Sequence, residues 1–227
     1  MPELDLRWRV LRRILGTPYL FALHVRVSGI ERIPARGAAI LAVNHVSVLD
    51  PIGVALVAYA RGRAIRFLAA AEFFDHHLAG PVLRGWDQIP IRRGVRDVAA
   101  LDELVMALGD GRLTGIFPEG RVADSLTRKR GGTGVARVAR ATGAPVIPVG
   151  IWGTQERLPR GQLRWSLPLR TPVAIAVGDP IPVAASISGT RELREATDRI
   201  MGSIETLTEH ARSATERWLL PRKDPSA

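Results

Sequence analysis

Short apolar runs alternate with helical patterns over most of the 227 residues, and this alternation restricts the fold more than any other feature. Each apolar run is bounded by turn residues and has the length of a buried strand. The runs cover residues 38–43, 65–70, 113–117, 146–151 and 173–177. Amphipathic helical patterns occur at residues 97–108, 134–142 and 191–212. Strands that alternate with helices predict an α/β fold with a mixed, largely parallel sheet flanked by helices.

The chain has no internal repeat and no long linker, so we expect one main domain at residues 26–220. An N-terminal amphipathic helical arm at 1–25 precedes this domain, and a flexible tail at 221–227 follows it. Apolar residues in the arm follow a 4-3-4 spacing, with arginines off the stripe; the stripe consists of Leu4, Trp8, Leu11 and Leu15. Such a basic helix can lie on an anionic membrane. The stripe can equally well pack on the domain, as in an ordinary surface helix.

The composition restricts the partners and the chemistry. A net charge of +10 suits an anionic partner, although codon usage alone is another explanation for the excess of arginine. The absence of cysteine excludes disulfides, zinc–thiolate sites and a thiol nucleophile. The first residues lack the features of a signal peptide, so we expect none. Asn44, His45 and Asp50 interrupt the apolar stretch 38–60, which is therefore read as core that carries a site.

The most informative polar residues follow the first predicted strand. This strand ends in Asn44-His45, and a helix is expected to start within a few residues, with Ser47 or Asp50 as its cap. A carboxylate at position 50 can accept the imidazole Nδ1–H of His45 and leave Nε2 free as a base. The alternative is that Asp50 only caps the helix and His45 is an ordinary turn histidine.

Three further segments occur in order after Asn44-His45-x4-Asp50. They are Ile89-Pro90-Ile91-Arg92-Arg93, Phe117-Pro118-Glu119-Gly120 and Val146-Ile147-Pro148-Val149. Together the four segments resemble, in order and spacing, the four motifs of the glycerophospholipid acyltransferase family. Residues 177–181 also resemble a strand and turn that commonly close this domain. Four segments in this order indicate the family far more specifically than any one of them alone.

The resemblance implies transfer of a fatty acyl group from acyl-CoA or acyl carrier protein to the 2-hydroxyl of 1-acylglycerol 3-phosphate. His45 would be the general base and Asp50 its orienting carboxylate. No Gly-x-Ser-x-Gly elbow is present, so we expect direct transfer without an acyl-enzyme. The acyl donor is a co-substrate, and we expect no other cofactor. The expected place of action is the cytoplasmic side of the cell membrane, with the protein bound peripherally.

The resemblance also distributes roles among the other motif residues. Arg93 would bind the acceptor phosphate, assisted by Arg121 and by backbone N–H groups of the turn at Gly120. Glu119 would hold Arg93 or a substrate hydroxyl. The remaining motif residues, in supporting positions, are Asn44, Ser47, Arg92, Pro118 and Pro148.

Two departures from the family pattern leave the acceptor open. Arg92 stands where an aspartate is common, and Arg121 comes one residue earlier than usual. Glycerol 3-phosphate or another lysolipid or glycolipid is therefore an alternative acceptor.

A nucleic-acid binder is not expected, because no recognised motif is present and only seven Phe and Tyr residues are available for stacking. A lipid-binding relative without catalysis is a further alternative, which the His45/Asp50 pair disfavours. Asp75-His76-His77 is not expected to bind a metal, because consecutive side chains on a helix point apart.

Overall fold

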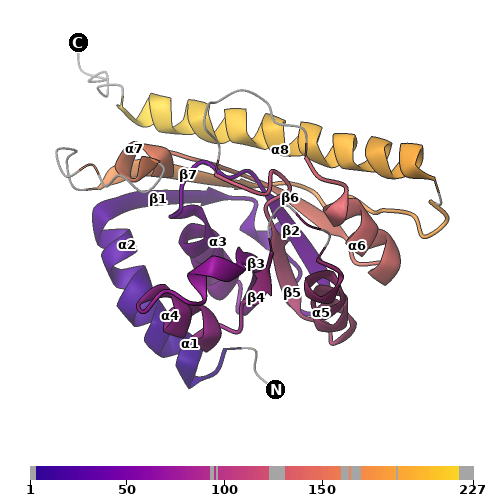
Figure 1. The fold of residues 1–227 in the computed structure, drawn as a ribbon. Coiled ribbons are helices and arrows are strands. Elements are labelled where there is room, and N and C mark those ends of the chain that lie inside the picture. Colours follow the sequence, from indigo (N-terminus) through magenta and orange to yellow (C-terminus); the bar gives the residue numbers. More distant parts are fainter. Residues whose placement is uncertain are drawn as a thin grey trace, which may run out of the picture.

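The computed structural model describes residues 4–92, 95, 97–122, 131–159, 164, 170–187 and 189–219. Its centre is a seven-stranded sheet with the strand order β1-β7-β6-β2-β5-β3-β4 (Figure 1). The strands are β1 (Leu23–Ser28), β2 (Ala39–Val43), β3 (Ile65–Ala70), β4 (Ile89–Ile91), β5 (Leu113–Ile116), β6 (Val146–Trp152) and β7 (Thr171–Val177).

The sheet is mixed and largely parallel. Strands β6, β2, β5, β3 and β4 run in the same direction, whereas β7 is antiparallel to β6 and β1 is parallel to β7. The predicted α/β fold class is confirmed, and all five predicted strands are present. Strands β1 and β4, which form the two edges of the sheet, were not predicted. Polar residues interrupt the apolar ones in β1, and β4 has only three residues, so neither resembles a buried run.

Eight α-helices and three short turns of other helix types connect the strands in the described part of the chain. They are α1 (Leu6–Leu11), η1 (Arg12–Gly16), α2 (Thr17–Ala22), η2 (Ile30–Arg32), α3 (Asp50–Ala60), η3 (Ala71–Phe73), α4 (Ala79–Gly85), α5 (Val98–Gly109), α6 (Gly134–Thr142), α7 (Thr154–Arg157) and α8 (Thr190–Leu219). Asp97 caps α5 by accepting the N–H of Ala100, and Gly143 ends α6 in the left-handed conformation. The third predicted helix is present as α8, which runs seven residues beyond the expected end at 212.

Each face of the sheet is covered by its own apolar core. On β2, Ile40 and Ala42 face a core completed by α5, α6 and α8, whereas Leu41 and Val43 face a core completed by α3 and the N-terminal helices. Figure 1 shows α8 lying across the sheet over β6 and β7. Strand β2 is the central strand of the sheet and is buried on both faces. The loop that starts at Asn44 therefore leaves the sheet in the middle of the domain.

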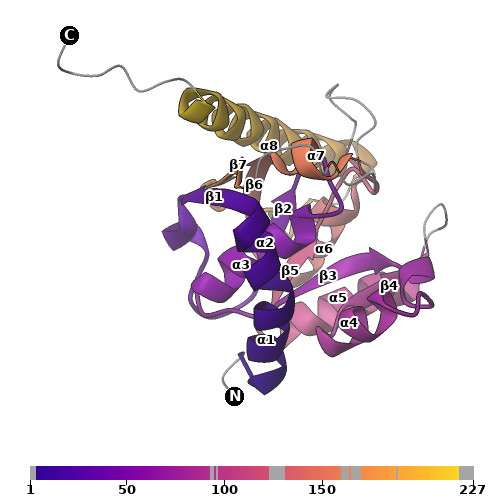
Figure 2. The same ribbon diagram turned by 90° about the vertical axis from the view of Figure 1, so that its left-hand side faces the viewer.

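The first helices pack on the domain. Figure 2 shows α1 and α2 in line along one side of the molecule. Trp8 is 7% exposed, and its ring stacks on Trp86 next to α4, with 5.4 Å between the ring centroids. Tyr19 of α2 is buried against α3, where a Cβ added at Gly53 would lie 2.4 Å from the Tyr19 hydroxyl. Leu4 and Leu15 pack on the same core. Three members of the predicted stripe therefore face inward.

Two boundaries of the predicted domain scheme can be compared with these elements. Strand β1 begins at Leu23, so the last three residues of the predicted arm, 23–25, lie in the sheet. The predicted tail, 221–227, lies outside the described residues.

Gly150 of β6 allows α8 to approach the sheet closely. A Cβ added there would lie 2.2 Å from the carbonyl carbon of Leu207 and 2.3 Å from the backbone nitrogen of Thr208. Both are backbone atoms of a long helix and cannot rotate away as a side chain can. The close contact between sheet and helix therefore depends on a residue without a side chain at this position.

We expect Gly150→Ala to destabilise the protein by about 1–3 kcal/mol, because α8 must move to make room for the methyl group. The control is Gly202→Ala on α8, where an added Cβ has no neighbour within 4 Å. This change should stabilise the helix by up to about 1 kcal/mol. Urea unfolding followed by circular dichroism measures both. Equal stability of wild type and Gly150→Ala would contradict the close approach.

Candidate functional site

The predicted site residues gather where parallel strands end. The loops that follow β2, β5 and β6 leave the sheet at the carboxyl ends of three adjacent strands. These loops carry Asn44 to Leu49, Phe117 to Arg121 and Gly153. Ligands of α/β proteins commonly bind at this edge of the sheet.

Asn44 joins the β2 loop to β6. Its side-chain Nδ2 donates to the carbonyl oxygen of Ile151 at 2.9 Å, and its Oδ1 accepts the N–H of Ile151 at 2.8 Å. The buried amide thus continues the pairing of β2 with β6 beyond the last backbone register pair, Val43 and Val149. Asn44 has the supporting position that the motif suggested, and it fixes the start of the loop that carries His45.

The side chain of His45 contacts that of Asp50. His45 Nδ1 lies 3.0 Å from Asp50 Oδ2, and the side chains are 15% and 0% exposed, respectively. The contact is the one expected from the sequence spacing. An ionised carboxylate only accepts hydrogen bonds, so in this geometry Nδ1 is the protonated nitrogen and Nε2 has a free lone pair in the neutral ring.

The Asp50 carboxylate has four hydrogen-bond partners among the described residues. Oδ2 also accepts the backbone N–H groups of Val46 and Ser47, both at 2.7 Å. Oδ1 accepts the Thr154 hydroxyl at 2.5 Å. A fully buried carboxylate is stable only when such donors replace its hydration, so these contacts explain how the group is kept inside the protein.

The interpretation of Asp50 or Ser47 as a helix cap is wrong. Leu49 occupies the N-cap position of α3, and no side chain makes the capping hydrogen bond. Asp50 is the first residue of the helix, and its carboxylate turns back to donors in the preceding loop. Ser47 Oγ instead accepts the N–H of Leu49 and donates to the carbonyl of Leu158. Ser47 thereby ties the loop after β2 to the end of α7.

Aromatic rings support one side of the histidine. The His45 ring stacks on Phe117, with 4.2 Å between the centroids and 25° between the planes. Phe117 in turn stacks on Phe67 of β3, at 5.6 Å and 17°. The Phe67 ring lies where a side chain of Gly115 would be, 2.2 Å from an added Cβ. The imidazole is therefore held on two sides, by a carboxylate at Nδ1 and by a ring on its face.

The turn after β5 lies against the histidine loop. Glu119 Oε1 accepts the backbone N–H of His45 at 3.2 Å. Pro118 is buried and its carbonyl accepts the N–H of Gly132, whereas Gly120 is exposed and in the left-handed conformation, with φ of 71°. Arg121 is exposed. The Glu119 carboxylate thus supports the position of His45, a role that the motif resemblance did not suggest.

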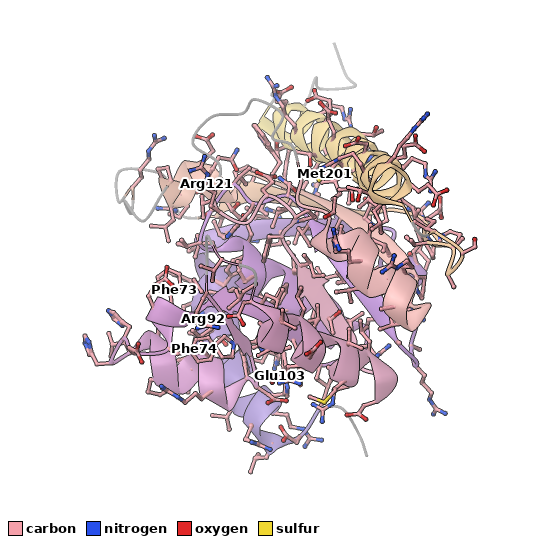
Figure 3. All side chains as sticks on the ribbon, turned by 45° about the vertical axis from the view of Figure 1, so that its right-hand side comes forward. Phe73, Phe74, Arg92, Glu103, Arg121 and Met201 are labelled. Atoms are coloured by element: carbon pink, nitrogen blue, oxygen red, sulfur yellow. The ribbon has the colours of Figure 1, made fainter. Side chains whose placement is uncertain are left out.

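The second motif is described only in part. Arg93, the predicted phosphate ligand, lies outside the described residues. The Arg92 backbone N–H and guanidinium both donate to Asp97 Oδ2, and these contacts hold the pKa of Asp97 below its usual value. In the view of Figure 3, Arg92 and Phe73 lie below Arg121, which is on the side toward α8. Arg92 and Asp97 therefore contact each other, five positions apart in the sequence.

Pro148 and Tyr19 are buried residues of the scaffold around the site. Pro148 is buried in β6, opposite Ala42 of β2, and its carbonyl accepts the N–H of Gly178. It therefore lies within the sheet, one strand away from the loop that carries His45. Burial raises the pKa of the Tyr19 hydroxyl, and the negative charge of Asp50 raises it further.

A metal-binding role for the paired histidines finds no support in the described residues. No group of three His, Asp or Glu residues there is arranged to hold a metal ion. His76 Nδ1 instead accepts the backbone N–H groups of Leu78 and Ala79, next to the start of α4. The His76 and His77 rings stack on each other at 4.6 Å.

Three residues of the site were not predicted from the sequence; they are Thr154, Phe117 and Phe67. Phe117 lies in one of the four motifs, but the motif does not indicate that its ring stacks on the His45 imidazole. Thr154 is 104 residues from Asp50 along the chain, so no local spacing could have paired them.

Comparison with known proteins gives three kinds of match. The model of the Acyltransferase family matches residues 24–152. Uncharacterised proteins of Mycobacterium tuberculosis and Mycobacterium leprae are both 31% identical over 162 residues, or 66% of this chain. The matched region spans less than half of these relatives, at 43% and 42% of their lengths.

Two matches carry a functional name. A 1-acyl-sn-glycerol-3-phosphate acyltransferase of Borreliella burgdorferi is 29% identical over 144 residues, which is 60% of this chain and 54% of that protein. The crystal structure of the 1-acyl-sn-glycerophosphate (LPA) acyltransferase PlsC from Thermotoga maritima matches 96% of this chain and 83% of its own, with a TM-score of 0.64 and 25% identity.

Proposed function

The chain belongs to the Acyltransferase family, and from this membership we propose that it transfers a fatty acyl group to a hydroxyl of a phosphate-bearing glycerolipid. The donor is acyl-CoA or acyl carrier protein. The acceptor is 1-acylglycerol 3-phosphate, acylated at its 2-hydroxyl to give phosphatidic acid. The enzymes named for this acceptor in Borreliella burgdorferi and Thermotoga maritima support this choice. Glycerol 3-phosphate or another lysolipid is the alternative within the class.

The observation that carries the proposal is the contact between His45 Nδ1 and the buried Asp50 carboxylate. This contact leaves Nε2 as the free base of a ring that is otherwise fixed by Phe117. A general base must reach the proton of the attacking hydroxyl, and His45 lies at the edge of the sheet where a ligand can approach.

In the proposed reaction the acceptor hydroxyl oxygen attacks the carbonyl carbon of the thioester while His45 Nε2 takes the hydroxyl proton. The tetrahedral intermediate expels the thiolate as the carbon–sulfur bond breaks. The imidazolium then returns its proton to the thiolate sulfur. The products are an ester and a free thiol, and His45 is neutral again. Asp50 stabilises the imidazolium without being protonated itself.

We expect His45→Ala to lower kcat by about 10²- to 10⁴-fold, because the general base is lost. Asp50→Asn should be comparably impaired, since an amide presents a donor where two backbone N–H groups now donate. His210→Ala, an exposed histidine on α8, is the control and should behave as wild type. Acyl transfer from labelled acyl-CoA to lysophosphatidic acid measures all three. Full activity of folded His45→Ala would disprove the mechanism.

Arg93 and Arg121 are the proposed phosphate ligands, with the backbone of the turn at Gly120 as a further donor. Arg93 occupies the family's arginine position in the second motif. A charge-assisted contact to phosphate contributes about 1.5–3 kcal/mol.

Arg93→Ala should therefore lower kcat/KM for lysophosphatidic acid by about ten- to a hundredfold. The defect should shrink sharply with a neutral monoacylglycerol, which has no phosphate to lose. Arg93→Lys should recover only part of the activity, because an ammonium cannot reproduce the planar fork. Arg191→Ala, an exposed arginine of α8, serves as the control. An equal loss on both acceptors would place Arg93 in the scaffold.

We also place a membrane-facing surface on the N-terminal helices, but on the face opposite to the predicted stripe. Large apolar side chains are exposed along this face; they are Leu6 (73%), Val10 (47%), Ile14 (57%), Leu20 (49%) and Phe21 (66%). Arg7, Arg9 and Arg13 are exposed beside them. Apolar residues flanked by arginines suit the surface of an anionic bilayer, at the cytoplasmic side of the cell membrane. No helix of the described residues has the length and apolar character to cross a membrane.

Serine substitutions at Leu6, Val10, Ile14 and Phe21 should weaken binding to anionic vesicles by about tenfold or more, since each exposed apolar side chain contributes when it enters lipid. Met106→Ser, an equally exposed side chain on α5, is the control and should bind as wild type. Vesicle flotation measures binding, and turnover of a soluble short-chain acceptor should change little. Unchanged flotation of the fourfold variant would refute this surface.

A further inference from the structure

Thr154 is the first residue of α7 and is fully buried. Its Oγ1 lies 2.5 Å from Asp50 Oδ1, the carboxylate oxygen that does not contact His45. The ionised carboxylate cannot donate, so the hydroxyl is the donor. Short hydrogen bonds of this kind, from a hydroxyl to an anion, are among the strong ones in proteins.

The structure holds Thr154 firmly in place. Gly153, at φ of 103°, brings the chain against β7, where an added Cβ would lie 2.1 Å from the carbonyl oxygen of Pro172. Arg157, one turn later in α7, donates to the Thr171 hydroxyl at 3.0 Å. The Leu158 carbonyl accepts the Ser47 hydroxyl from the histidine loop. Helix α7 is therefore tied both to the sheet and to the loop that carries His45.

The two carboxylate oxygens have separate tasks in this arrangement. Oδ2 accepts His45 Nδ1 and the N–H groups of Val46 and Ser47, and Oδ1 accepts Thr154. Without the hydroxyl, Oδ1 loses this buried donor, and the carboxylate can lower its energy by rotating toward other donors. Such a rotation moves Oδ2 away from the line of the His45 Nδ1–H bond.

We propose that Thr154 is a positioning residue for acyl transfer: its hydroxyl fixes the rotation of the Asp50 carboxylate and thereby the orientation of the His45 ring. This inference rests on the proposed function of the His45/Asp50 pair. It goes beyond the four motifs, because Thr154 lies outside all of them.

The test compares Thr154→Val, which keeps the shape but removes the hydroxyl, with Thr154→Ser, which keeps the hydroxyl. Thr154→Val should lose about ten- to a hundredfold in kcat, with KM for the acceptor within about twofold of wild type. Thr154→Ser should retain kcat within about threefold. The matched control is Thr114→Val, because Thr114 is equally buried and its hydroxyl has no hydrogen-bond partner among the described residues. This control should keep its kcat.

A second readout does not depend on turnover. Nitrogen-15 spectra of the histidine rings, with His45 assigned from the His45→Ala protein, report the tautomer and the hydrogen bond at Nδ1. Thr154→Val should alter the His45 signals, whereas Thr154→Ser and Thr114→Val should leave them unchanged. Wild-type kcat and unchanged His45 signals in folded Thr154→Val would overturn the proposal. If Thr154→Val does not fold, Thr154→Cys, with a weaker donor of similar size, replaces it under the same criteria.

The outcomes separate this inference from the function on which it rests. If the wild-type protein transfers no acyl group to any acceptor, the proposed function fails. The nitrogen-15 spectra alone then show whether the Thr154 hydroxyl orients the His45 ring. If the wild type is active but Thr154→Val matches it in kcat and in the His45 signals, only the positioning role fails.

Discussion

The buried Asp50 carboxylate is the group on which the arrangement of the site depends. A charge without solvent contact needs donors from the protein, and here they come from two separate connections, the loop after β2 and the start of α7 after β6. These connections meet because β2 and β6 are neighbours in the sheet. Asn44 strengthens this by binding both backbone groups of Ile151. The strand order thus brings the donors to Asp50 together, and the hydrogen bonds to Asp50 in turn hold the two connections in place.

The two faces of the sheet contribute differently to the site. The face covered by α5, α6 and α8 is mostly scaffold, and α8 reaches the sheet through Gly150. The opposite face brings α3 and the N-terminal helices together under the site. Tyr19 packs on Gly53, one turn after Asp50 in α3. The first helices are accordingly part of the core that supports the His45/Asp50 pair, and they keep a second face exposed to solvent.

Much of the fold could be predicted from the sequence, because buried strands and amphipathic helices leave local periodic patterns. The pair His45/Asp50 could also be predicted, since both residues lie in one short segment. The predicted cap role of Asp50 was wrong because a carboxylate can accept N–H groups either from a helix end or from a loop. The sequence does not show which of these N–H groups lies within reach. In the N-terminal helices, both the predicted stripe and the opposite face contain apolar residues. The periodicity alone does not show which of the two faces packs on the domain. Strands β1 and β4, and the hydroxyl of Thr154, depend on partners distant in the chain and leave no local pattern.

The stacking of His45 on Phe117 has a consequence for how two substrates must approach. With Nδ1 engaged by Asp50 and one ring face covered, the imidazole presents a single nitrogen to incoming molecules. In the proposed reaction that nitrogen removes a proton from an oxygen and later delivers it to a sulfur. Both atoms must then lie within hydrogen-bond reach of the same point, about 3 Å away, on either side of one carbonyl carbon. In that reaction the two substrates therefore meet along the line on which the Nε2 lone pair points, and Asp50 and Phe117 together set that line through the orientation of the ring.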